Sequence, residues 1–276
     1  MPATNARRST YLAAAVGLLL AIPTSSALAE SHAPRHAGGE HPLTSVLDYA
    51  RNGLDRIDNE IADYSCTLIK RERVDGELLE REYLYAKVRH QPFSVYLYFL
   101  APQAKKGQEV IYVEGMNNNK LCAHAGSGPR ALIGKVFLPP EGMLAMTDNR
   151  YPITFFGFRT LIKRLIEVGE HDLAYGECEV TQFDNAKING RACSCIQVKH
   201  PVPREEFQYH LARIFIDEEM QVPVRLTAYE WPEKAGGPPK LVEEYTYVNV
   251  KLNQGLTDRD FDYRNEKYRF VSKPKK

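Results

Sequence analysis

The sequence predicts an α+β fold in which helices cover the concave face of one curved antiparallel sheet. Residues 83–124 contain three successive strand-like runs with turns between them. Strands that follow one another this closely, with no intervening helix, are antiparallel neighbours. Residues 43–62 and 155–168 each carry a one-sided apolar stripe at helical spacing. Such a stripe needs a partner surface, and the sheet provides it.

The second of these runs, residues 93–99, has two different faces. Its apolar face consists of Phe93, Val95, Leu97 and Phe99, and its other face carries Tyr96 and Tyr98. The first run is 83–88 and the third is 109–114. Asn117–Asn119 offers a turn before residues 120–124 resume a strand. We expect these runs to form the centre of the sheet.

The helix expected at 43–62 would be capped by Thr44 or Ser45. A hairpin should follow, with strands at 64–73 and 77–89 joined by the turn Asp75-Gly76. We expect the helix at 155–168 to begin after a Thr154 cap and to end at Gly169. The remaining strands are predicted at 178–187, 191–200, 208–217, 222–231 and 241–252, before a turn at Thr257–Phe261 that tucks Phe261 back.

The N-terminus has the pattern of a signal peptide over residues 1–29. Arg7 and Arg8 precede an apolar run at 11–22, and Ala27-Leu28-Ala29 precedes Glu30. An uncleaved membrane anchor is the alternative, but twelve apolar residues fall short of the roughly 20 that span a bilayer. No Cys follows the small residues, so lipid attachment is not expected. We therefore expect a periplasmic or otherwise extracytoplasmic protein.

Three further segments complete the predicted organisation: a disordered linker at 30–42, one domain at 43–270 and a basic tail at 271–276. The linker contains His32, His36 and His41, which could pick up metal adventitiously, although a spacer is the simpler interpretation. The basic tail could touch a membrane surface, or it could be a solvated terminus. We expect membrane contact to be at most peripheral.

Composition argues against nucleic acid as a partner. The 276 residues carry a formal charge of +1, which becomes −1 once Arg7 and Arg8 leave with the signal peptide. No global field therefore draws the protein to nucleic acid. The hydrophobic fraction of 43% is enough for a substantial core.

The five cysteines do not indicate a cofactor. They are Cys66, Cys122, Cys178, Cys193 and Cys195. A metal or redox site would need a second close pair besides Cys193 and Cys195, which share a strand face. The alternatives are one structural disulfide or buried thiols. We predict no metal and no other cofactor.

Catalytic motifs are also missing. The sequence has no Gly-x-Ser-x-Gly, no phosphate-binding Gly loop and no His-Glu-x-x-His. Cys122 and His124 would share a strand face, but no third group orients them. Asp258 is better interpreted as support for the last turn than as a metal ligand. We therefore predict that the protein is not an enzyme and has no catalytic residues.

The segment from residue 125 to 152 is rich in Gly and Pro, and we expect a long loop without secondary structure. Met143, Leu144 and Met146 are lid candidates, because adaptable side chains suit a cover over an apolar surface. Gap filling is the more common role of Met.

Several short runs resemble the family called domain of unknown function 1571, over roughly residues 43–270. They are Lys87-Val88-Arg89 through Pro92-Phe93-Ser94-Val95-Tyr96, Glu109-Val110-Ile111-Tyr112-Val113, Asn149-Arg150-Tyr151-Pro152-Ile153-Thr154 and Leu256-Thr257-Asp258-Arg259-Asp260-Phe261. The order of elements resembles the LolA/LolB-like lipoprotein-carrier superfamily. That resemblance implies an incomplete barrel of about ten or eleven strands, with helices plugging a cavity for acyl chains.

Two functions are compatible with these observations. The first is binding or carrying lipid or lipoprotein acyl chains in an apolar cavity. Its candidate lining residues are Val95, Leu97, Phe99, Ile111, Val113, Leu161 and Leu165. The alternative is a cell-envelope domain that interacts with a protein partner and has a filled core without ligand. The two differ in whether the concave face is hollow.

Overall fold

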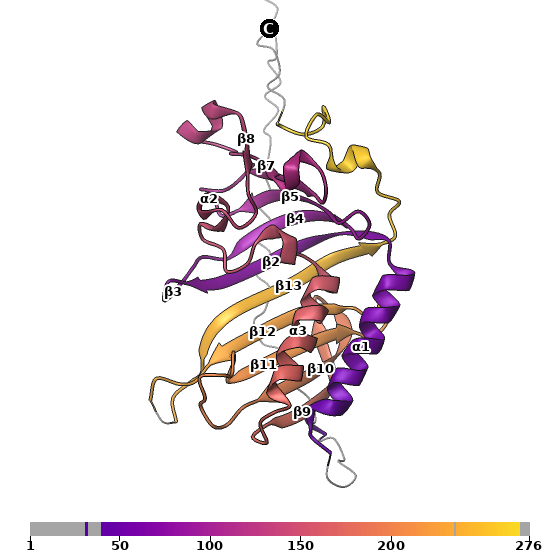
Figure 1. Ribbon diagram of the computed structural model, residues 1–276, viewed down its shortest axis with the longest axis vertical. Helices are drawn as coiled ribbons and strands as arrows, with labels where there is room; N and C mark the ends of the chain where they lie inside the picture. Colours follow the sequence, from indigo (N-terminus) through magenta and orange to yellow (C-terminus); the bar gives the residue numbers. More distant parts are fainter. Residues whose placement is uncertain (1–30, 33–39, 235, 271–276) are drawn as a thin grey trace, which may run out of the picture.

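The computed structural model describes residues 31–32, 40–234 and 236–270, which form one curved antiparallel sheet with two long helices (Figure 1). The predicted signal peptide, most of the predicted linker and the basic tail lie outside the described residues. Within the described ranges, no helix is long and apolar enough to cross a membrane.

Across the described ranges, the sheet contains thirteen strands. In chain order they are β1 (Ser31–His32), β2 (Asp63–Val74), β3 (Glu77–Leu78), β4 (Glu82–Arg89), β5 (Ser94–Ala101), β6 (Glu109–Val113), β7 (Leu121–His124), β8 (Lys135–Leu138), β9 (Glu179–Ile188), β10 (Arg191–Lys199), β11 (Leu211–Asp217), β12 (Pro223–Glu230) and β13 (Lys240–Leu252). Their spatial order is β1-β9-β10-β11-β12-β13-β2-β4-β5-β6-β7-β8, with β3 beside β2. Because β1 and β8 are both edges, the sheet is an open half-barrel. Eleven strands are longer than two residues, which agrees with the expected ten or eleven.

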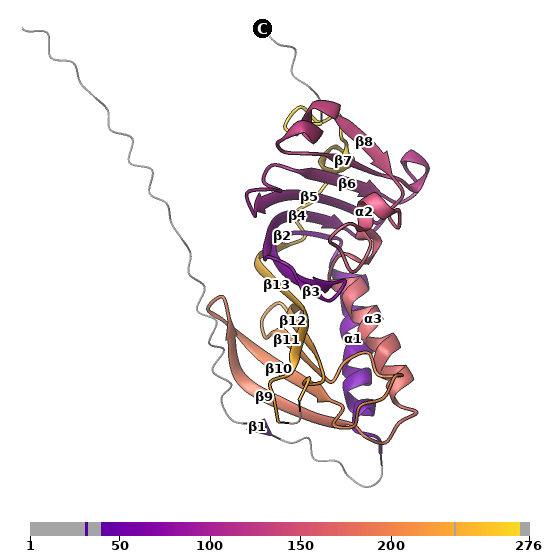
Figure 2. The same ribbon diagram turned by 90° about the vertical axis from the view of Figure 1, so that its left-hand side faces the viewer.

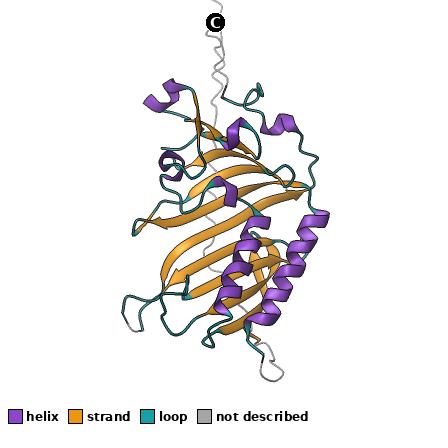
Figure 3. Cartoon of the chain, in the orientation of Figure 1, coloured by secondary structure: helices purple, strands orange, loops and turns teal. Residues whose placement is uncertain are grey.

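The two long helices lie on the same face of the sheet, as Figures 2 and 3 show. They are α1 (Leu43–Glu60) and α3 (Phe158–Asp172), and α2 (Met143–Met146) is a single turn. Short 3-10 helices occur at η1 (Asn117–Asn119), η2 (Pro129–Ile133), η3 (Ile153–Phe155) and η4 (Asp258–Phe261). Leu47 and Ile57 of α1 and Ile162 of α3 belong to the same core cluster as the concave side of the sheet. The expected placement of both helices is confirmed.

The predicted ends of α3 are wrong. The helix begins at Phe158 after Gly157, not after Thr154, and it continues through Gly169 to Asp172. A Cβ at residue 169 would lie 2.8 Å from Leu47 Cδ2 of α1. Gly169 therefore allows the two helices to pack closely and does not end the helix.

The predicted cap of α1 is also wrong. Neither Thr44 nor Ser45 makes a side-chain cap; instead the Leu43 backbone N–H donates to His41 Nδ1 at 3.2 Å. The imidazole performs the same role as a hydroxyl cap, since it supplies an acceptor to an unpaired N–H of the first turn.

The segment 125–152 has more structure than we expected. It contains η2, α2 and the edge strand β8, which pairs with β7 from Leu121↔Leu138 to His124↔Lys135. Four residues between Gly134 and Pro139 are too few to show a strand period in the sequence. The expectation of a loop without secondary structure is wrong for this part.

The face of the sheet opposite the helices carries a second, smaller core. It consists of Tyr96, Ile111, Cys122, Phe261, Tyr268 and Phe270. The chain after β13 covers this face, and Phe261 is buried there as predicted. Tyr96 stacks on Tyr268 with ring centroids 4.2 Å apart. This convex cluster leaves the concave face to the helices and the segment around α2.

Candidate functional site

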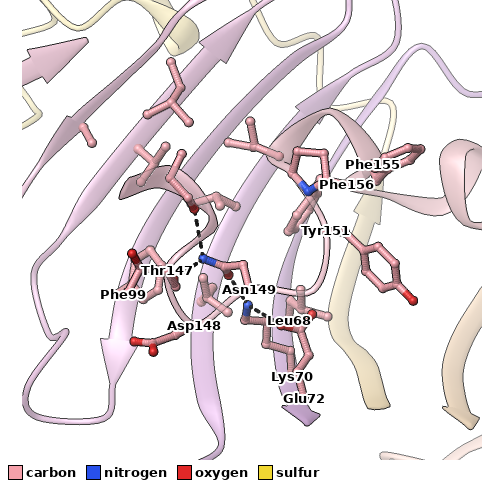
Figure 4. A pocket seen from close by; sticks show the side chains of 18 of the residues that line it. Leu68, Lys70, Glu72, Phe99, Thr147, Asp148, Asn149, Tyr151, Phe155 and Phe156 are labelled. Carbon is pink, nitrogen blue, oxygen red and sulfur yellow. Dashed lines mark hydrogen bonds and ion pairs between the residues drawn. The ribbon is translucent and has the colours of Figure 1, made fainter. Parts of the chain in front are cut away.

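A cavity of about 480 Å³ lies on the concave side, between the sheet and the chain from α2 to α3 (Figure 4). Its apolar wall includes, from the sheet, Leu68, Leu84, Leu97, Phe99, Val110, Leu121 and Leu138. From the covering segment it includes Leu144, Ile153, Phe156, Leu161 and Leu165. The helices therefore cover the concave face without filling it.

Four of the predicted lining residues reach this cavity: Leu97, Phe99, Leu161 and Leu165. Val95 is fully buried in the core and does not line it. Of the lid candidates, Leu144 lines the cavity, whereas Met143 and Met146 do not.

Ile111 and Val113, which we expected to line the cavity, lie instead at the convex cluster. Tyr96 pairs with Ile111 across β5 and β6, so Ile111 lies on the convex face and Val113 packs against the same convex cluster. Val110 is the residue of β6 that lines the cavity. Both faces of β6 are buried, so its sequence does not reveal which side chains point inward.

Exposed apolar side chains lie at one part of the cavity lining and beside it. Ile133 and Leu144 line the cavity and are still 70% and 72% exposed. Beside them, Leu132 and Met143 are 90% and 88% exposed. These four residues, called the apolar rim below, belong to η2 and α2. The rim therefore adds exposed apolar side chains next to the cavity.

One end of the cavity is polar. Glu72 of β2 and Glu243 of β13 lie directly opposite each other in the sheet, and both are buried. Two like charges in that position destabilise a sheet unless each has a partner. Glu243 accepts hydrogen bonds from Tyr209 at 2.7 Å and Tyr151 at 2.8 Å, and pairs with Arg150 Nε at 3.0 Å.

Glu72 has its own set of partners. Lys70 Nζ lies 3.2 Å from its carboxylate, the Arg150 backbone N–H donates to it at 3.1 Å, and the Tyr245 hydroxyl donates to its other oxygen. Figure 4 shows that Lys70 forms hydrogen bonds with both Glu72 and Asn149. These interactions hold the segment 149–151 against the sheet.

Burial dominates the electrostatics of Glu243. It raises the pKa of this carboxyl, although Tyr209, Tyr151 and Arg150 favour the ionised form. Burial also raises the pKa of Tyr209 and of Tyr151. The tyrosines therefore remain hydrogen-bond donors to the carboxylate.

This polar cluster was not predicted from the sequence. One feature of the sequence does indicate it. By the two-residue strand period, Lys70 and Glu72 lie on the same strand face as Leu68, so two charged side chains point toward the apolar interior. The pairing of Glu72 with Glu243 could not be found in this way, because it joins distant parts of the chain.

A second cavity of about 260 Å³ lies under α1 and α3, next to β10, β11 and β12. It shares Leu165, Val168 and Tyr209 with the first cavity. Side chains of α3 and one tyrosine therefore border both cavities.

Residues 31–32, 40–234 and 236–270 contain no group of three His, Cys, Asp or Glu placed to hold a metal ion. All five cysteines are free and buried. Burial raises the pKa of the Cys178 thiol to about 12, which keeps it protonated and a poor nucleophile.

The fold and the site together define an open antiparallel half-barrel with an apolar cavity on its helix-covered face. The chain belongs to the DUF1571 family, described as "Protein of unknown function", which matches residues 61–270. This confirms the resemblance seen in the sequence. A search of curated proteins found no match.

Solved structures show distant similarity. Lipoprotein LppX of Mycobacterium tuberculosis is 13% identical, with a TM-score of 0.46, over 79% of this chain and 98% of that one. A putative outer membrane lipoprotein-sorting protein domain from Vibrio parahaemolyticus is 11% identical, with a TM-score of 0.38, over 78% and 95%. The LolA superfamily protein NE2245 from Nitrosomonas europaea is 12% identical, with a TM-score of 0.30, over 79% and 96%. The fold described above rests on this chain's own topology.

Proposed function

We propose that this protein binds a lipid or a lipoprotein acyl chain in its concave cavity, outside the cytoplasm. The observation that carries the proposal is an apolar cavity of about 480 Å³ that the core leaves unfilled. Ligand sites typically hold roughly 300 to 1,000 Å³ and combine an apolar wall with a few polar groups. Both properties match this cavity.

The energetics favour an aliphatic ligand. Each CH₂ group moved from water into such a wall contributes about 0.8 kcal/mol, so ten buried groups would contribute about 8 kcal/mol before the costs of association. The apolar rim fits the same ligand, because an acyl chain would meet apolar side chains from the entrance inward.

The covering segment would gate the cavity. Leu144 lines the cavity and is largely exposed, and Asn149 and Tyr151 further along the same segment are attached to the sheet through Lys70 and Glu243. Opening would break these polar contacts while the half-barrel stays intact. Segments of this kind close over bound ligands in many proteins.

The test is to purify the protein from its native envelope, extract it with organic solvent and analyse the extract by mass spectrometry. We expect a stoichiometric lipid. An empty protein that also fails to bind any long-chain amphiphile added to it would overturn the proposal and favour the protein-interaction domain.

A further inference from the structure

Arg164 of α3 lines the cavity, and its charge has no counterion there. Among the described residues, no carboxylate lies within 4.0 Å of its guanidinium nitrogens, and it donates no hydrogen bond to a protein atom. Its guanidinium carbon lies 4.1 Å from the centre of the Tyr151 ring. Such a cation–π contact holds the guanidinium beside the ring, while its N–H donors have no acceptor among the described residues.

The other cations of the polar end are all paired. Lys70 lies 3.2 Å from Glu72, Lys105 lies 3.2 Å from Asp148, and Arg150 lies 3.0 Å from Glu243. Lys70 and Lys105 also contact Glu82, which is buried behind them. Lys70, Lys105 and Arg150 therefore neutralise the carboxylates at this end of the cavity. Arg164 is the cation of the lining that has no carboxylate partner among the described residues.

Tyr151 fixes the position of Arg164. The Tyr151 hydroxyl donates to Glu243 and contacts the Tyr209 hydroxyl at 3.2 Å, so its ring cannot turn freely. On α3, Leu161 and Leu165 line the same cavity as Arg164. The free donors of Arg164 thus lie where the polar end of the cavity meets its apolar wall.

We propose that Arg164 binds the anionic head group of an amphiphile whose hydrocarbon chain occupies the cavity. This rests on the proposed lipid-binding function. The head group is a carboxylate or a phosphate, because both match the forked donors of a guanidinium with two parallel hydrogen bonds. A free fatty acid supplies the first and a lipid phosphate the second.

The experiment compares three probes of equal chain length on the delipidated full-length protein: palmitate, hexadecyl phosphate and hexadecanol. Isothermal titration at neutral pH should show at least about tenfold tighter binding of one or both anions than of the neutral alcohol, the size expected for hydrogen bonds to a charged group. The comparison of palmitate with hexadecyl phosphate identifies the head group.

Arg164→Gln should abolish the preference for the anions over hexadecanol. Lys163→Gln is the matched control: it removes the adjacent charge on α3, and Lys163 does not line the cavity. It should keep the preference. Arg164→Lys keeps the positive charge but loses the two parallel N–H donors of the guanidinium. It should retain part of the preference for the anion.

Equal affinity of the wild-type protein for the alcohol and both anions would overturn the head-group assignment and leave lipid binding intact. That measurement needs no variant, so it stands even if Arg164→Gln folds poorly. Loss of the preference in Lys163→Gln as well would also overturn the assignment. It would indicate that the general positive charge of α3, and not hydrogen bonds from Arg164, attracts the anion. A protein that binds none of the three probes would refute the proposed function itself.

Discussion

Tyr64 of β2 stacks on Phe158 of α3, with ring centroids 4.2 Å apart, and its hydroxyl accepts a hydrogen bond from the Phe158 backbone N–H at 3.1 Å. Both side chains are fully buried. The first backbone N–H groups of a helix have no acceptor within the helix. The Tyr64 hydroxyl supplies an acceptor for the buried N–H of Phe158. It also fixes the start of α3 on a central strand, and with it the position of Leu161 over the cavity.

Tyr64→Phe should lower the free energy of unfolding by about 1 to 3 kcal/mol, because it leaves the Phe158 N–H buried without an acceptor. Urea denaturation measures the change. Tyr247→Phe is the control, since its ring centroid also lies 4.8 Å from that of Phe158 and its hydroxyl makes no hydrogen bond within the described part of the chain. Equal losses in the two variants would contradict this role of the Tyr64 hydroxyl.

Leu97→Trp should block the cavity. Leu97 lines its wall, and an indole there would occupy space that the proposed ligand needs. We expect loss of co-purifying lipid in a protein that still unfolds cooperatively. Leu100→Trp, on the same strand but 40% exposed, should keep the lipid. Full lipid content in a folded Leu97→Trp protein would place the ligand elsewhere.

Local signals in the sequence predicted much of the sheet. Asp75-Gly76 and Asn189-Gly190 both adopt positive φ, as the two-residue hairpin turn requires. The strands around Asn189-Gly190 lie where we expected, whereas the single strand expected at 77–89 is divided into β3 and β4. Such turns depend only on neighbouring residues. Gly169 shows the opposite case: the same residue type that ends many helices here allows a neighbouring helix to approach.

The site was less predictable than the fold because it depends on register and on distant pairing. Leu97 and Phe99 were identified because β5 alternates clearly, whereas Ile111 was misplaced because β6 is apolar on both faces. Nothing near Glu72 in the sequence indicates that Glu243 lies opposite it. Arg164 is one of several charges on a helix, and only the folded chain shows that it faces the cavity.

Glu243 should make the protein less stable as the pH rises. Burial raises its pKa in the folded state above the unfolded value, so the stability that it contributes is present below the unfolded pKa and is lost as the pH rises through the folded pKa. Glu243→Gln removes this titration. The difference in unfolding free energy between wild type and Glu243→Gln should therefore favour the wild type more at pH about 4 than at pH about 7.

Urea denaturation of both proteins at each pH measures that difference. Titrating groups that do not interact with Glu243 cancel in the comparison. A wild type that gains stability relative to Glu243→Gln on raising the pH would show that Arg150 and the two tyrosines outweigh burial.

Met143→Ser should change uptake of lipid but not stability. The side chain is 88% exposed and belongs to the apolar rim, so its removal costs the folded state little. It should slow the transfer of a fluorescent fatty acid from vesicles to the protein, because the rim would offer less apolar surface at the entrance. Val202→Ser, another exposed apolar position outside the cavity lining, is the control. Equal transfer rates in all three proteins would exclude a role of Met143 in entry.

The five cysteines should resist alkylation in the native protein. All are free and buried, and burial raises the pKa of the Cys193 thiol to about 11 and of the Cys195 thiol to about 12, so almost no thiolate is present near neutral pH. Iodoacetamide should therefore add nothing to the folded chain, and it should modify five residues after denaturation without reductant. Intact-mass spectrometry counts the added groups. Only three modified cysteines in the denatured, unreduced chain would reveal a disulfide, and modification of the folded chain would show that burial does not protect these thiols.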